Sequence, residues 1–345
     1  MLNILDLGFL SLALTVGFTG FVINHYEKHV PAFIVKGFKY GSFAYQGSEA
    51  NFLQIIEVPK ALYRHFYAFS SVFSAVTLIY AILVYRFEFT VHGSIGFLLK
   101  LTLEQDEPTV PALAALLALS LLLVQCIRRC YETYYLQVFA KSSKMNLSHY
   151  LVGLVHYYAV IVATIGQAPL FCGSQNRDKI LWSDTKTLVL AIPCTIIFIW
   201  AWYEQFMTNI IFANLRKDKK SGDVITEEHK IPHGRLFEHV SSPHRLCEII
   251  IYMVLLVLIP TRTFFCIFMW VIANQVSILL LYHLFIFLGS IALIKVLDNS
   301  FTHISSMNGH HILYLVQTAI HAHVWYKKSF SNYPNERTAL IPNIL

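Results

Sequence analysis

The residues best suited to chemistry lie between two apolar segments in the second half of the chain. Gln205, Asn209 and Arg216 are spaced at i, i+4 and i+11, so on one continuous helix they would share a face. His244 and Glu248 follow where the next apolar segment begins. Amides, a guanidinium and an imidazole that converge on one place suit a phosphorylated ligand. A solvated basic loop at a membrane surface is the alternative explanation of the same spacing.

The sequence of this region is more specific than its spacing. Asn214-Leu-Arg-Lys is followed by His229-Lys-Ile-Pro-His-Gly, and then by Phe237-Glu-His-Val-Ser-Ser-Pro-His. In order, spacing and membrane context these motifs resemble the steroid 5-alpha-reductase family, most closely its polyprenal reductase branch. The resemblance is specific in 204–248 and 323–342, moderate at 57–67 and weak in the first apolar segment.

The resemblance implies that NADPH binds here. Asn209, Arg216, His244 and Glu248 match cofactor-binding positions of the family, with Gln205 one turn before Asn209. Other branches carry Asn and Asp where Gln205 and Asn209 stand, which changes individual hydrogen bonds rather than the role. No Gly-rich fingerprint follows a strand, so a Rossmann site is not expected.

A preference for NADPH over NADH needs a cation for the additional phosphate. Lys230, which precedes Ile-Pro, is one candidate, and the sequence does not rank it against Arg216, Lys217 or Lys219. His323 and Tyr326, at i and i+3, resemble the residues with which the family's last helix closes over the cofactor. His321 is an alternative to His323, and a lone histidine in such a place is more often structural.

Two residues are candidates for holding the substrate carbonyl. Glu57 stands at a membrane edge, where a carboxyl is costly unless it is paired or protonated. The family places a carboxylate here to orient that carbonyl, whereas the alternative is an ordinary interfacial glutamate. The family also supplies a tyrosine hydroxyl from the third span. Tyr131 is our candidate, although Cys126 lies near the expected position and tyrosines beside arginines are ordinary interfacial anchors.

Composition identifies the elements that must position these residues. Hydrophobic residues make up 56% of the 345 and charged residues 13%, against about 25% charged in a soluble domain. We therefore expect an all-α, multi-pass transmembrane helical bundle. The net charge of +6 then reports orientation rather than nucleic-acid binding. The six cysteines show no CxxC or Cys/His spacing, so no metal site is expected.

About seven spans are predicted from the length a bilayer requires. They are 4–23, 66–85, 109–127, 147–171, 187–207, 246–260 and 264–285. With the N-terminus lumenal and the C-terminus cytosolic, most Lys and Arg residues fall in cytosolic segments, as the positive-inside rule requires. We expect one integral membrane domain, 1–345, with the reductase signature in 204–345.

Residues 277–317 are anomalous, because the apolar sequence there is too long for one span and displaces the tail motif. Two additional crossings or a surface excursion would keep the tail cytosolic, whereas one crossing would invert it. A gene-model error is the third interpretation. We favour that error or a surface excursion.

The resemblance implies reduction of an activated double bond. A hydride needs an electrophilic carbon, which an alkene conjugated to a carbonyl has and an allylic alcohol lacks. This favours polyprenal as the substrate and dolichal as the product, in the endoplasmic reticulum membrane, where dolichol serves protein N-glycosylation. A 3-oxo-Δ4-steroid reductase and a non-enzymatic lipid-binding membrane protein are the alternatives. We expect polyprenal and membrane lipids as partners, with no nucleic acid and no obligate protein partner.

Overall fold

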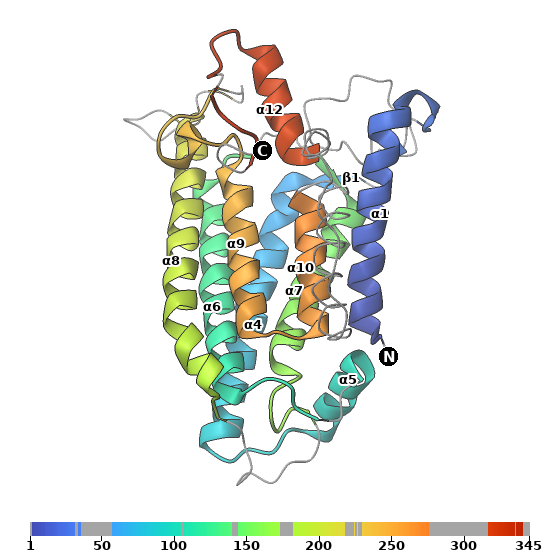
Figure 1. Cartoon of the computed structure of the whole chain (residues 1–345), viewed down its shortest axis with the longest axis vertical. Helices are drawn as coiled ribbons and strands as arrows, with labels where there is room; N and C mark the ends of the chain where they lie inside the picture. Colours follow the sequence, from blue (N-terminus) through green and yellow to red (C-terminus); the bar gives the residue numbers. More distant parts are fainter. Residues whose placement is uncertain are drawn as a thin grey trace, which may run out of the picture.

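A computed structural model describes residues 2–31, 34–35, 57–104, 107–139, 144–172, 182–217, 224, 226, 230–275, 317–334 and 336–340. The described chain is an upright helical bundle (Figure 1). Its helices are α1 (Ile4–Tyr26), α4 (Tyr63–Arg86), α5 (Gly93–Leu103), α6 (Ala112–Tyr131), α7 (Leu147–Ile165), α8 (Thr185–Asn214), α9 (Pro243–Leu258), α10 (Arg262–Gln275) and α12 (Gln317–Ser329). The predicted all-α class is confirmed.

Among the described residues, five helices are long and apolar enough to cross a membrane. They span Ile4–Ile23, Lys60–Arg86, Ala112–Leu136, Leu147–Ile165 and Thr185–Asn214. These coincide with the first five predicted spans. α9 and α10 run alongside them in Figure 1, but their 16 and 14 residues fall short of the roughly 20 that a straight crossing needs. The total of seven spans stays a prediction.

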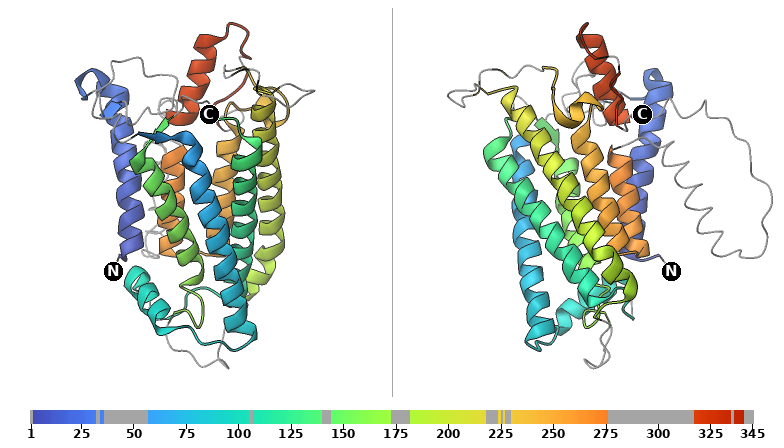
Figure 2. Two further views of the ribbon diagram at one scale, coloured as in Figure 1. Left: turned by 180° about the vertical axis from the view of Figure 1, so that it is seen from behind. Right: turned by 60° about the vertical axis from the view of Figure 1, so that its left-hand side comes forward.

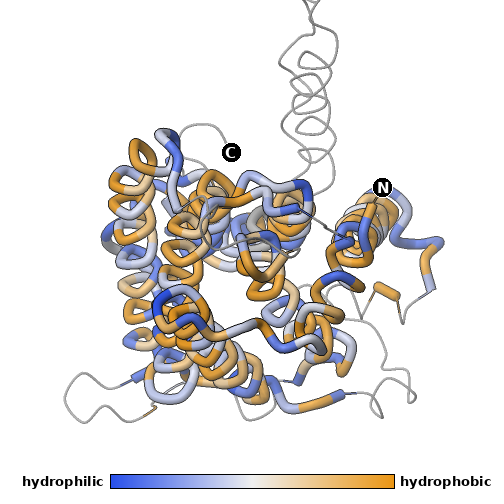
Figure 3. The backbone as a smooth tube through the Cα atoms, turned by 90° about the horizontal axis from the view of Figure 1, so that it is seen from below, coloured by the Kyte–Doolittle hydropathy of each residue, from blue (hydrophilic) through white to orange (hydrophobic). Residues whose placement is uncertain are grey.

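The outside of the bundle is as apolar as a membrane requires. Large side chains such as Phe18, Val72, Ile192 and Ile196 are exposed. Figure 3 shows hydrophobic residues on outward-facing as well as inward-facing turns of the helices. A helix that is hydrophobic all round is typical of a membrane span.

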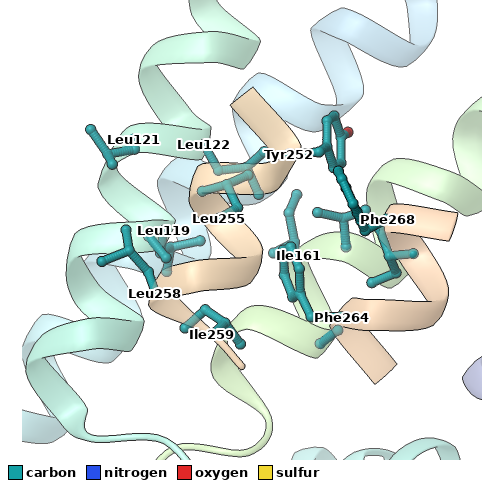
Figure 4. Close-up of a cluster of buried hydrophobic side chains, with 14 of the residues drawn as sticks. Leu119, Leu121, Leu122, Ile161, Tyr252, Leu255, Leu258, Ile259, Phe264 and Phe268 are labelled. Carbon is teal, nitrogen blue, oxygen red and sulfur yellow. The ribbon is translucent and has the colours of Figure 1, made fainter. Parts of the chain in front are cut away.

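The core lies where α6, α7, α9 and α10 meet. Leu119, Ile161, Leu255 and Phe264 interdigitate there, and each is no more than 1% exposed (Figure 4). Burying one such side chain stabilises the fold by about 1.5–3 kcal/mol. This packed region fixes the helices whose ends carry the polar site.

One end of the bundle collects the segments that carry the sequence motifs. α1, α6 and α8 end there, α4 and α9 begin there, and α12 stands on the same end (Figure 2). A short antiparallel pair of β1 (Glu57–Pro59) and β2 (Lys144–Asn146) lies at this end as well. Thr338 forms a bridge with Val240, so the tail lies beside the predicted cytosolic loop. Residues 277–316 of the predicted insertion lie outside the described residues.

At the opposite end of the bundle, polar residues at the start of α1 form a cluster of hydrogen bonds and an ion pair with neighbouring helices. Asn3 and Asp6 form a capping box at the start of α1. Asn3 Nδ2 donates to the Leu103 carbonyl at 3.1 Å and to the Thr263 hydroxyl at 3.0 Å, and Arg262 pairs with Asp6. These contacts connect α1 to α5 and α10. α5 was not predicted, because it lies in a segment that we expected to be a lumenal loop.

Candidate functional site

A buried polar network lies inside the bundle where α6 ends. Arg128 donates hydrogen bonds to Glu132 Oε1 at 3.0 Å, to Gln125 Oε1 at 2.7 Å and to the Gln205 side-chain oxygen. Arg128 is 4% exposed and Glu132 is fully buried. Buried charges persist only when they are paired and hydrogen-bonded. At Glu132 the helix widens into a π-helical turn, η3 (Glu132–Leu136), a feature frequent at functional sites.

Glu132 links three helices. Its Oε1 accepts from Arg128, while its Oε2 accepts from Arg129 and from Asn209 Nδ2, the latter at 2.9 Å. Arg129 in turn donates to the Tyr67 hydroxyl at 2.9 Å, and its guanidinium lies 4.8 Å from the centre of that ring. The carboxylate therefore joins α6 to α8 directly and to α4 through Arg129.

α8 and α9 contribute the residues that the sequence singled out. Gln205 Nε2 donates to Glu248 Oε2 and to the His244 carbonyl, the latter at 2.8 Å. Gln125 Nε2 also donates to Glu248 Oε2 at 3.3 Å and to Gln205 Oε1 at 3.1 Å. Asn209, one turn along α8, is buried in the same network through its bond to Glu132. The predicted common face of Gln205 and Asn209 is confirmed, whereas their role in binding stays a prediction.

Arg216 lies beyond the end of the helix that carries Gln205 and Asn209. α8 ends at Asn214, so Arg216 lies in the following turn and donates to the Val138 carbonyl at 2.9 Å. The helix therefore does not continue to Arg216, although the bond to Val138 directs its guanidinium toward the segment that follows η3. Arg216 and Arg245 lie close enough to Lys60 for their charges to act on it. Three cations are thus grouped beside the network, at the start of α4 and α9 and the end of α8.

Among the enclosed polar atoms that have no hydrogen-bond partner within the described residues, two nitrogens belong to this site. They are Arg128 Nε and His244 Nδ1. The His244 ring meets the Phe212 ring edge-on at 5.4 Å, so one side of the imidazole is apolar. An enclosed polar atom without a partner costs about 1–3 kcal/mol, a cost that a polar ligand can offset.

The tail packs over the loop that precedes α9. His323 Nδ1 and the Tyr333 hydroxyl each lie 2.6 Å from Ser241 Oγ. Tyr326 is 7% exposed, stacks on Tyr333 at 5.4 Å, and directs its hydroxyl to the Lys230 carbonyl at 3.5 Å. His323 and Tyr326 thus face the same side of α12, as their spacing predicted. The Lys230 side chain is exposed.

Burial determines how two tail residues titrate. Burial, with a smaller contribution from the Lys327 charge, lowers the pKa of His323 to about 4. Burial, followed by the nearby Tyr333, raises the pKa of Tyr326 to about 12 against the opposing charges of Arg216 and Arg337. At neutral pH both side chains are therefore neutral. They contribute hydrogen bonding and packing rather than charge.

The two candidates for the substrate carbonyl come from β1 and from the end of α6. Glu57 is in β1, and its Oε2 lies 3.4 Å from Lys144 Nζ, so this carboxyl is paired with a cation. Tyr131 is 51% exposed and packs against Tyr135 and Phe206. Tyr131 is thus largely exposed, and its role in holding the carbonyl stays a prediction.

Sequence reasoning missed the residues at the centre of the network. Arg128 and Arg129 were interpreted as loop charges beyond a span ending at 127, but α6 continues to Tyr131 and encloses them. A usable signal was present. Gln125, Arg128 and Glu132 stand at i, i+3 and i+7, which places three polar side chains on one face of an otherwise apolar helix.

Comparison with known proteins assigns the family. The family model for 3-oxo-5-alpha-steroid 4-dehydrogenase matches residues 144–286 and 297–345. The chain belongs to this family. A polyprenal reductase of Drosophila melanogaster is 30% identical over 349 aligned residues, which cover all of this chain and 94% of that protein. One of Caenorhabditis elegans is 28% identical and covers 97% and 94%, and one of Homo sapiens is 30% identical and covers 57% and 61%.

Membership of the 3-oxo-5-alpha-steroid 4-dehydrogenase family confirms the resemblance seen in the motifs. The matched ranges contain every residue of α8, α9 and α12 that was singled out. They omit residues 287–296, which lie within the predicted insertion. α6 precedes the matched ranges, so the polar face formed by Gln125, Arg128 and Glu132 is a finding of the structure.

Proposed function

We propose that the chain is an NADPH-dependent polyprenal reductase. It would reduce the α-isoprene double bond of polyprenal and release dolichal. The observation that carries the proposal is the similarity to polyprenal reductases along the whole chain. The buried network supports it, because residues that the motifs single out for cofactor binding come together there.

The network suits the polar parts of a nicotinamide cofactor. Amides of Gln205 and Asn209 can bond the carboxamide and the ribose hydroxyls, and Glu248 can accept from either. Arg128 Nε and His244 Nδ1 would gain the partners that they lack among the described residues. These atoms fit a ligand with both donors and acceptors better than they fit a lipid tail.

The cations at the edge of the network suit phosphates. Lys60, Arg216 and Arg245 repel one another unless an anion lies between them, and a guanidinium binds phosphate with two parallel bonds. Arg216 also acts on Tyr326 of the tail, so α12 lies within electrostatic range of this group. We infer that these cations hold the phosphates of NADPH and that α12 covers them.

The chemistry follows from where the charge develops. Bound NADPH supplies a hydride to the β-carbon of the conjugated aldehyde. Negative charge then appears on the aldehyde oxygen, where buried donors stabilise it most effectively. A proton added to the α-carbon completes the saturated aldehyde. The carboxylates of Glu132 and Glu248 accept hydrogen bonds from amides or guanidiniums and would fix these donors around the reacting atoms.

The apolar character of the substrate indicates where it would lie in the protein and in which membrane the protein would work. An isoprenoid chain is apolar along its length, so it would lie among the helices and lipid while its aldehyde reaches the polar end of the bundle. We place the protein in the endoplasmic reticulum membrane, where its product would supply dolichol for protein N-glycosylation. The end that carries the network would face the cytosol and its NADPH.

Expression in cells that lack their own reductase tests the proposal. Membranes containing the full chain should convert polyprenal to dolichal only when NADPH is present. A parallel assay with a 3-oxo-Δ4 steroid tests the second candidate, which the description of the matched family favours. Reduction of the steroid alone, or of neither compound by stably expressed protein, would contradict the proposal.

A shortened chain tests the domain boundaries. We propose that residues 277–317 are not needed for the reaction. The chain without them should retain or gain activity. Activity that is present only in the full chain would show that this segment belongs to the working enzyme.

A further inference from the structure

One tyrosine inside the bundle is held by a cation. Tyr67 lies in α4 and is 9% exposed. Its hydroxyl oxygen accepts a hydrogen bond from Arg129 at 2.9 Å, and the guanidinium also lies 4.8 Å from the centre of its ring. Arg129 is fixed in turn by the Glu132 carboxylate. The position of the hydroxyl is therefore determined by an ion pair rather than by packing alone.

The Tyr67 proton remains available. Its oxygen is the acceptor in the bond from Arg129, and no bond donated by this hydroxyl occurs within the described part of the chain. The neighbouring Tyr252 differs, because its hydroxyl is paired with His156 Nε2 at 2.7 Å. Tyr157, whose ring lies 5.6 Å from that of Tyr67, contacts no guanidinium among the described side chains. Of these three tyrosines, only Tyr67 combines an available proton with a fixed positive charge.

The Tyr67 side chain has both polar and apolar neighbours. Its polar neighbour is Arg129, which leads through Glu132 to the amide of Asn209. Its aromatic neighbours include the rings of Phe66, at 4.9 Å, and Tyr157. A conjugated aldehyde on an isoprenoid chain likewise combines a polar head with an apolar body.

We propose that the Tyr67 hydroxyl, positioned by Arg129, donates the hydrogen bond that holds the substrate's aldehyde oxygen. This inference rests on the proposed function. It assigns to α4 a role that we first expected from Tyr131, which lies at the periphery of the bundle. Tyr67 would be a catalytic residue and Arg129 a positioning residue.

The reaction balances without consuming Tyr67. The reduced nicotinamide gives two electrons and a hydrogen to the β-carbon, and the π electrons of the double bond move to make the enolate. The Tyr67 hydrogen bond strengthens as charge grows on the enolate oxygen, and the Arg129 charge stabilises that polarised hydroxyl. A solvent proton then adds to the α-carbon as the carbonyl re-forms. Tyr67 keeps its own proton.

Paired Tyr→Phe variants of the full chain in lipid nanodiscs test this assignment. Tyr67→Phe should lower kcat about 100-fold, the size of effect seen when one oxyanion donor is removed. NADPH affinity, followed by cofactor fluorescence, should stay within about twofold, since the nicotinamide-binding groups are untouched. Tyr157→Phe removes a hydroxyl from the adjacent buried ring and should keep kcat near that of the wild type.

A spectroscopic measurement separates a catalytic role from a structural one. Dolichal labelled with ¹³C at its carbonyl should show an infrared band at lower wavenumber when bound to the wild type or to Tyr157→Phe, because a hydrogen bond weakens the C=O bond. Bound to Tyr67→Phe, the band should move back toward its position in lipid. Equal bands in the wild type and Tyr67→Phe, or equal losses of kcat in the two Phe variants, would overturn the inference. A wild type that binds the aldehyde with a shifted band but oxidises no NADPH with polyprenal would refute the proposed function instead.

Discussion

Replacing Glu132 with Gln tests whether the buried network holds the bundle together. Glu132 is fully buried and accepts from two guanidiniums and one amide. Glutamine keeps the shape and one acceptor oxygen, but it removes the charge and turns an amide donor toward groups that are themselves donors. Breaking a buried ion pair by removing one partner costs about 3–5 kcal/mol. We expect a loss of unfolding free energy in that range.

The matched control is Glu107→Gln, the same chemical change at an exposed position. Surface charge substitutions change stability by about 0.5 kcal/mol or less. Unfolding of the purified protein by denaturing detergent, followed by loss of helical signal, measures both variants. Adding Arg129→Gln to Glu132→Gln removes one of the stranded charges, so the double variant should lose less than the sum of the single variants. Equal stability of Glu132→Gln and Glu107→Gln, or strict additivity in the double variant, would refute the reasoning.

Three further predictions concern the cofactor, the substrate and the tail. Arg216→Ala should raise the NADPH concentration needed for half-maximal rate about tenfold or more, since a hydrogen bond to a charged group contributes about 1.5–3 kcal/mol. The control Arg86→Ala, at the opposite end of the bundle, should leave this concentration unchanged. Identical NADPH curves for the two variants would argue against a phosphate-binding role of Arg216. Glu57→Gln should cut turnover at unchanged protein level, and retained turnover would show that the essential group lies elsewhere. In the folded protein the pKa of His323 is about 4, below its usual value of 6.5, so the folded tail holds this side chain in its neutral form. Packing of the tail should therefore be intact above pH 6.5 and should be lost as the pH falls toward 4. Proteolysis of the tail between pH 7.5 and 5 measures this loss, and a His323→Gln tail that keeps the same pH dependence would exclude His323 as its cause.

Hydropathy was enough to predict most of the helices. The first five spans were located because about 20 consecutive apolar residues have few structures other than a membrane helix. α5 was missed because its 11 residues are too short to cross. α6 was ended too early, since a hydropathy window stops at Arg128 even when that arginine is buried against Glu132. The helix end depended on a pairing that composition does not reveal.

The candidate site was predictable only where helical spacing decides it. Gln205 and Asn209 lie on one face because they are one turn apart within α8. For Arg216 helical spacing does not decide the position, because α8 ends at Asn214 and the following turn sets where its side chain lies. The bond between Arg129 and Tyr67 joins residues 62 positions apart, on helices whose contact no local pattern predicts.

Transfer of deuterium from the cofactor to the lipid tests the central claim most directly. Purified full-length protein would be given NADPH carrying deuterium at the transferable position of C4, together with unlabelled polyprenal, and the product would be analysed by mass spectrometry. We predict dolichal that carries one deuterium at the β-carbon. Recovery of polyprenal unchanged, or of a dolichal whose β-carbon carries no deuterium, would contradict the account.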